Sequence, residues 1–152
     1  MGWNKSFYDY KFKTSGYHYK VGLCILSGNI CWWNGPYEPG DWNDKMIFKD
    51  ALAKNLEEYE RCETNRGYRG SAPGLVKCPG GLLADPDLSV KAISARVRSR
   101  QETVNERFKN WEILNAPYWH NIFKHQIVFG AIVCLTQLSL QDNQLFSIDY
   151  YD

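Results

Sequence analysis

Residues 96–111, RVRSRQETVNERFKNW, set the carboxylate of Glu102 among several basic side chains within one short stretch of the chain. Carboxylate oxygens are the ligands that Mg²⁺ and Mn²⁺ prefer, and guanidinium and ammonium groups bind phosphates. This combination suits a metal-dependent reaction on DNA, although a charged run on a helix is more often simply a solvated face. The candidate DNA-binding residues are Arg96, Arg98, Arg100, Arg107 and Lys109.

The same stretch has the hydrophobic spacing of a helix packed on a core, because its apolar residues recur on one face of a 3.6-residue period. Glu102 lies to the side of this apolar stripe. Arg96 and Arg100 are four residues apart and should stack on one flank as part of a positively charged strip. We therefore expect a long helix that presents both Glu102 and this strip. The stripe consists of Ile93, Val97, Val104, Phe108 and Trp111.

Composition limits these interpretations only loosely. The 152 residues fit one domain, residues 1–152, with enough apolar and aromatic content to bury a core. Because the net charge is only +1, any affinity for DNA must be local. The five cysteines are an odd number at irregular spacings, and no signal peptide precedes them, which favours a reducing interior compartment over secretion.

A zinc site is a weak alternative for the cysteines and histidines. Cys62, Cys78, His120 and His125 could form a set of two cysteines and two histidines. The cysteines of a structural zinc site normally come from a tight CxxC knuckle, however, and this pair is too widely separated. We expect His120 and His125 to be exposed helix residues, and His18 to be a surface residue of a strand.

The remaining elements follow from periodicity and turn residues. Alternation in Tyr17 to Leu26, followed by Ser27-Gly28-Asn29 and Ile30 to Asn34, predicts a β-hairpin. A helix over about 44–57, capped by Asp41 or Asn43, should follow, and then short strands near 59–64 and 74–78. A second long helix is expected after Pro117, as a buried core helix, because the apolar run 127–135 is shorter than the roughly twenty residues that a bilayer requires. We predict no membrane association and an extended C-terminal tail.

Several phrases in this order resemble a known family. They are GYHYKVGLCILSGNICWWNGP, GDWNDKMIF, RGYRG with VKCP, SRQETVNERFKNWEIL and QLFSIDYYD. Over nearly the whole chain they resemble DDE-superfamily endonucleases of the PIF/Harbinger transposase type. The resemblance implies an RNase H-like mixed α/β sheet with flanking helices, a nuclear location, and DNA as a partner. It also implies that three carboxylates hold two Mg²⁺ or Mn²⁺ ions for strand cleavage and joining.

Two of the three acids can be placed by this resemblance. The third acid of the family stands seven residues before a lysine on the long helix, as Glu102 does before Lys109. The second acid precedes a residue of any type, glycine and tyrosine, and here that position is Asn65. An amide is neutral and binds metal less well than a carboxylate, so catalysis should suffer. Glu63 could supply the missing carboxylate in place of position 65, but it would lie one pleat further along the strand from the site. Alternatively, Asn65 is simply a turn residue.

The first acid has no clear counterpart. In the family it lies on a strand upstream of the hairpin, and Asp9 is the one acid before the hairpin here. We expect Asp9 to be a surface residue, since FYDYKFK resembles the stretch that follows the catalytic strand. The fold should therefore lack the first core strand, which leaves a gap or exposed edges that invite another copy or another chain. Asp44 in GDWND matches a family aspartate outside the triad, for which we prefer a helix-capping role.

The sequence thus leaves three classes of function open. The first is a transposase endonuclease domain that is catalytically degenerate, so that metal binding is doubtful and enzymatic activity is not expected. The second is a non-catalytic DNA- or protein-binding module derived from such a domain. The third is a structural relic with neither activity.

Overall fold

The structure is a computed structural model that describes residues 5–9, 14–72, 74–84, 86–116, 118 and 120–148. It is a mixed α/β fold with small sheets and several helices. The chain forms two compact units, each built from two separate stretches. Unit 1 consists of residues 1–18 and 37–94, and unit 2 consists of residues 19–36 and 95–152. Each unit is described by itself below.

Unit 1 carries two of the three two-stranded sheets found among the described residues. One is antiparallel and pairs β1 (Tyr8–Asp9) with β2 (Thr14–Ser15). The other is parallel and pairs β5 (Cys62–Glu63) with β6 (Val76–Lys77), with Cys62 opposite Val76. The predicted strands near 59–64 and 74–78 are therefore confirmed, though each is shorter than expected. The 3-10 turns of the unit are η1 (Lys5–Phe7) and η4 (Arg66–Tyr68).

The helical segment of unit 1 is less regular than its sequence predicts. It begins as α1 (Asp44–Ile47), continues as a π-helical turn η2 (Phe48–Leu52) and ends as a 3-10 turn η3 (Ala53–Asn55). The side chain of Asn43 caps it by accepting hydrogen bonds from the backbone N–H groups of Lys45 and Met46. The capping role expected for Asp44 is wrong, because Asp44 is already the first helical residue.

The core of unit 1 is small. Ile47 is fully buried, and Phe48, Val76 and Cys78 are buried beside one another. Partly buried side chains from η2, η3 and the segment around β5 pack against this cluster. The parallel strand pair is thus covered on one face by the helical segment, as the apolar stripe of residues 47–56 predicts.

Unit 2 contains most of the predicted hairpin, β3 (His18–Leu23) and β4 (Ile30–Tyr37), which form the third two-stranded sheet. The turn between them closes with hydrogen bonds from the N–H of Gly28 to the oxygen of Cys24 and from the N–H of Cys24 to the oxygen of Asn29. Gly28 has a φ of +75°, in the left-handed region that favours glycine. The hairpin prediction is confirmed.

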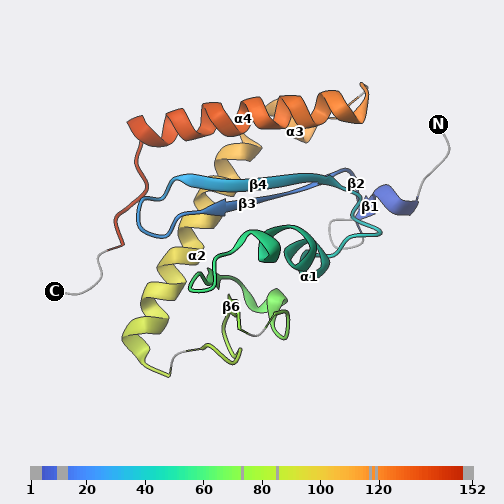
Figure 1. Ribbon diagram of the computed structural model, residues 1–152. Helices are drawn as coiled ribbons and strands as arrows, with labels where there is room; N and C mark the ends of the chain where they lie inside the picture. The colour runs from blue at the N-terminus through green and yellow to red at the C-terminus, as the bar shows by residue number, and fades with distance from the viewer. Residues whose placement is uncertain are drawn as a thin grey trace. The chain divides into compact units, whose positions relative to one another are not determined.

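The described helices of unit 2 are α2 (Leu88–Lys109), α3 (Glu112–Asn115) and α4 (Ile122–Asp142). The first turns of α2 belong to unit 1. Figure 1 shows α4 running along the hairpin. The unit's core joins Val104 and Phe108 of α2 to a buried face of α4, and Tyr19, Val21 and Leu23 of β3 pack against it. The predicted long helix and C-terminal core helix are both present.

The C-terminal helix is longer than the apolar run in its sequence. By length and composition alone, α4 is the one helix among the described residues that could cross a membrane. One of its faces packs in the core of unit 2, so the prediction of a buried core helix is correct for that face only, and the opposite face is exposed. Residues 144–148 of the tail form no helix or strand, and residues 149–152 lie outside the described part of the chain, so the extended tail stays a prediction.

Candidate functional site

Glu102 lies on α2 with an exposed side chain, in the part of that helix that belongs to unit 2. Lys109, also exposed, ends the same helix. Seven residues are close to two helical turns, so both side chains leave α2 on nearly the same side. The arrangement leaves the Glu102 carboxylate open to a ligand.

Asn65 lies in unit 1, directly after β5, where its side chain closes a turn. Its Oδ1 accepts a 2.8 Å hydrogen bond from the backbone N–H of Gly67 and so caps the 3-10 turn η4. A Cβ on residue 67 would approach that Oδ1 to 2.9 Å, which explains the glycine. The interpretation of Asn65 as a turn residue is confirmed. A carboxylate at this position could accept the same hydrogen bond.

Glu63, the possible substitute for an acid at position 65, has its own partner in unit 1. Its carboxylate accepts a 3.2 Å hydrogen bond from the hydroxyl of Ser94. Glu63 is half-buried and lies opposite Lys77 in the parallel strand pair. These contacts give the side chain a structural role between β5 and the first turns of α2.

Asp9 and His18 depart from the expectation that both are surface residues. Asp9 is buried in unit 1, and its carboxylate lies 2.7 Å from Nε2 of His18, which is half-buried. A buried carboxylate needs a charged or hydrogen-bonding partner, and His18 supplies one. Asp9 is therefore a paired structural acid, and both predictions are wrong for this reason.

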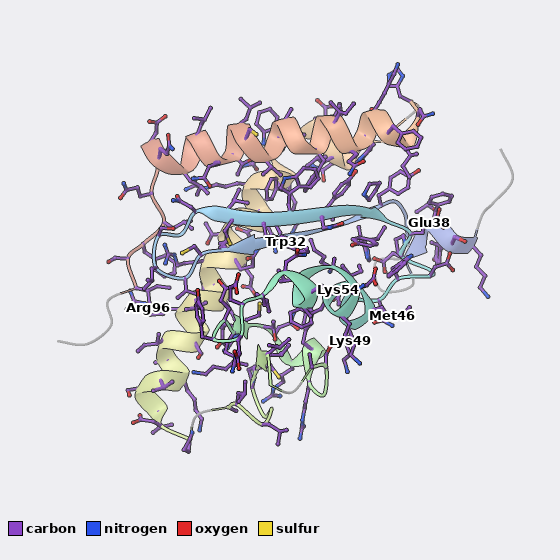
Figure 2. The ribbon with its side chains drawn as sticks, viewed as in Figure 1. Trp32, Glu38, Met46, Lys49, Lys54 and Arg96 are labelled. Carbon is purple, nitrogen blue, oxygen red and sulfur yellow. The ribbon has the colours of Figure 1, made fainter. Side chains whose placement is uncertain are left out.

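The positively charged strip on α2 is interrupted. Arg96 is exposed and projects from α2, as Figure 2 shows, where it donates to the oxygen of Ser147 and lies 5.6 Å from the ring centre of Phe146. Arg107 donates to the oxygens of Ser139 and Asn143 at the end of α4. Both guanidinium groups help to fix the segment around the end of α4, whatever else they bind.

Arg100 is buried, with only 4% of its surface exposed, so its place in an exposed DNA-binding strip is wrong. Its Nη1 donates a 2.8 Å hydrogen bond to the oxygen of Ile25 in the hairpin turn. A Cβ at position 28 would lie 2.1 Å from Nη2, so Gly28 makes the room that the guanidinium occupies. Hydrogen bonds from Ser27, and more weakly the charge of Arg100, lower the pKa of the nearby Cys24 thiol. Arg100 thus holds the turn of the hairpin onto α2.

The described residues contain no group of three His, Cys, Asp or Glu side chains placed to hold a metal ion. The zinc alternative gains no support, since Cys62 and Cys78 pack in the apolar cluster of unit 1. His125 is buried, against the expectation of an exposed residue, and its Nδ1 shares a 2.7 Å hydrogen bond with the hydroxyl of Tyr19. Burial lowers the pKa of His125. His120 is exposed, as expected, but it lies before the start of α4 and not in a helix.

The fold and these side chains define a mixed α/β protein with an exposed helical carboxylate and nearby basic residues. No family model, no curated protein and no solved structure matches the chain.

Proposed function

We propose that the chain is a degenerate endonuclease domain of the DDE superfamily, of the PIF/Harbinger type, with an RNase H-like arrangement that lacks the first core strand. The order of elements supports this proposal: a hairpin, a helical segment, two short parallel strands and a long helix follow one another. In such a fold β3 and β4 are the second and third strands, and β5 and β6 are the fourth and fifth. The parallel pairing of β5 with β6 agrees with that assignment.

The observation that carries the proposal is the break in the sheet. The hairpin β3–β4 and the parallel pair β5–β6 are separate two-stranded sheets. In an RNase H-like sheet the first strand lies between the second and the fourth, so its loss would divide the sheet between β3 and β5. The chain also divides into two compact units, with β5–β6 in one and most of the hairpin in the other. Among the described strands, none joins these two sheets in the position of the first strand.

The residues present do not fit a two-metal site. Of the two positions that the resemblance assigns, position 102 has a carboxylate and position 65 has an amide that caps a turn. Asp9 is engaged by His18 in unit 1. One carboxylate supplies too little charge and too few oxygens for two Mg²⁺ or Mn²⁺ ions. We therefore propose that the chain has lost strand cleavage.

Plasmid nicking tests the loss of activity. The purified chain, incubated with supercoiled plasmid and Mn²⁺, is expected to produce no more nicked circles than the Glu102→Gln variant. Because Glu102 is exposed, this substitution leaves the fold intact and removes only the charge. Robust nicking by the unaltered chain that the substitution abolishes would contradict the proposed degeneracy.

The second candidate function is a non-catalytic DNA-binding module in the nucleus, and the exposure of Arg96 and Lys109 favours it. Replacing both by alanine should weaken duplex binding. It should also reduce the slope of log Kd against log salt concentration by about two, because two fewer phosphates are neutralised. Lys49, exposed on the helical segment of unit 1 and visible in Figure 2, provides the control position. The Kd for duplex DNA is compared between Lys49→Ala and the double variant Arg96→Ala, Lys109→Ala. An equal loss of affinity in both would argue against an interface on α2.

The break in the sheet also implies a partner. In an RNase H-like sheet, the edges of β3 and β5 would pair with the first strand, and unpaired strand edges attract strands of other chains. We propose that either another copy or a different chain supplies a strand to one of them. Binding of that partner should give the backbone amides of the strand that it pairs with new protection from hydrogen exchange.

A further inference from the structure

Helix α4 is apolar on two opposite faces, and its packing within unit 2 explains only one of them. The buried face consists of residues spaced by three, four and seven positions that pack on the hairpin and α2. A helix that is apolar all round is normally buried all round. The buried residues are His125, Phe129, Ile132, Val133, Thr136 and Leu140.

The opposite face of α4 is apolar and exposed. Phe123 and Ile127 are each 72% exposed, Leu135 is 47% exposed and Leu138 is 56% exposed. Successive residues turn by about 100° around a helix, so these four side chains lie on one side together with Ala131. Figure 2 shows side chains projecting from α4 both toward the hairpin and away from it. The exposed side is named the outer face of α4 here.

The outer face has one charge near each end and none between. Lys124 begins it, Asp142 ends it, and residues 125–141 contain no Lys, Arg, Asp or Glu. Both side chains are exposed and lie on the same line along the helix, between Ala131 and Leu135 around its circumference. If two copies of α4 pack antiparallel, Lys124 of each copy meets Asp142 of the other, whereas a parallel pair would bring like charges together. Ala131, near the middle, lets two helices approach closely.

From this charge pattern we propose that the outer face of α4 binds the same face of a second copy, in antiparallel orientation. This inference does not depend on the proposed function. The exposed parts of the four side chains amount to on the order of 400 Å² of apolar surface per copy, which is the size of patch that marks an interaction site. Two such patches fall below the area of a permanent dimer, so we expect a reversible dimer.

A lipid bilayer is the other surface that an apolar helix could meet, and α4 has the length to cross one. Two contacts within unit 2 oppose insertion. Gln137 accepts a hydrogen bond from the N–H of Ile30 and donates one to Asn29, and His125 is bonded to Tyr19. These hydrogen bonds hold α4 against the hairpin, so only its outer face is available to contact a lipid surface or another chain.

Sedimentation velocity of the full chain from about 1 to 300 µM, with reductant to prevent disulfides through Cys134, tests the dimer. We expect a monomer–dimer equilibrium that Ile127→Glu with Leu138→Glu shifts at least tenfold toward monomer. Leu88→Glu, at a position of α2 that is 79% exposed, is the control and should leave the equilibrium unchanged. Circular dichroism verifies that each variant is folded.

A charge exchange tests the orientation. Lys124→Asp alone and Asp142→Lys alone should each weaken the dimer, and the two together should restore it to the original Kd. A monomer at all concentrations, a dimer that ignores the outer-face substitutions, or a double exchange that fails to restore binding would each overturn the proposal. Sedimentation with phosphatidylcholine–phosphatidylglycerol vesicles that Ile127→Glu abolishes, in a chain that stays monomeric, would assign the face to a membrane instead.

Discussion

Replacing Gly28 by alanine tests whether Arg100 is a structural residue. Gly28 has a φ of +75°, and a Cβ there would lie 2.1 Å from Nη2 of the buried Arg100. The left-handed backbone alone costs an alanine about 1–2 kcal/mol. Displacing the guanidinium also breaks its bond to the oxygen of Ile25, and a hydrogen bond to a charged group contributes about 1.5–3 kcal/mol. Gly28→Ala should therefore lower the free energy of unfolding by about 3–5 kcal/mol.

Urea denaturation followed by circular dichroism measures this effect, and two controls isolate its cause. Gly70 has a φ of +79° with nothing within 4 Å of its Cβ position, so Gly70→Ala should cost only the backbone term, about 1–2 kcal/mol. In an Arg100→Met background, Gly28→Ala should fall to that same cost, because the clash is gone. Equal costs for Gly28→Ala and Gly70→Ala in the unaltered background would refute the assignment of Arg100 to the hairpin turn.

Three further outcomes follow from the structure. Burial lowers the pKa of His125 below its ordinary 6.5, so the unfolded chain binds the proton more tightly than the folded chain does. The free energy of unfolding should therefore fall as the pH drops from 7.5 to 5.5. Urea titrations at several pH values should show that His125→Phe reduces this dependence on pH. Asn65→Asp should keep the free energy of unfolding within about 0.5 kcal/mol, because a carboxylate also accepts from Gly67, whereas Asn65→Ala should lose about 1 kcal/mol. Ile47→Ala should cost about 2–5 kcal/mol in the same assay, since the side chain is fully buried.

The elements were predictable where the information is local. Alternation placed Tyr19, Val21 and Leu23 on one face of a strand, and these residues do pack on the core of unit 2. The 3.6-residue stripe that includes Val104 and Phe108 likewise predicted α2 and its buried face. Both patterns work because backbone geometry repeats over a few residues, so the sequence alone carries them.

The burial of single polar residues was not predictable, because it depends on distant partners. Arg100 looked like part of a surface strip, and its partner Ile25 is 75 positions away in the sequence. His125 looked exposed, and the hydroxyl that it contacts belongs to Tyr19, 106 positions away. No local pattern shows that a hairpin turn will accept a guanidinium. The one available signal was Gly28, whose missing side chain makes the space.

The candidate site residues also include some whose structure was predictable from local sequence and some whose structure was not. Asn65 as a turn residue was predictable from the following glycine, because asparagine side chains bond the backbone two residues on. The pairing of Asp9 with His18 was not, since it depends on how the segment around β1 folds back toward the first residue of β3. The three acids of an endonuclease would come from separate elements, so spacing alone does not establish their common site.

We propose above that the chain is a DDE-type endonuclease domain without metal-dependent strand cleavage, and Mn²⁺ binding is the first property to measure. In a calorimetric titration with Mn²⁺, we expect the unaltered chain to bind the ion no more tightly than the Glu102→Gln variant. Glu106→Gln, four residues along the same exposed helix, is the matched control. Mn²⁺ binding by the unaltered chain that Glu102→Gln weakens at least tenfold and Glu106→Gln leaves unchanged would refute the proposed loss of activity.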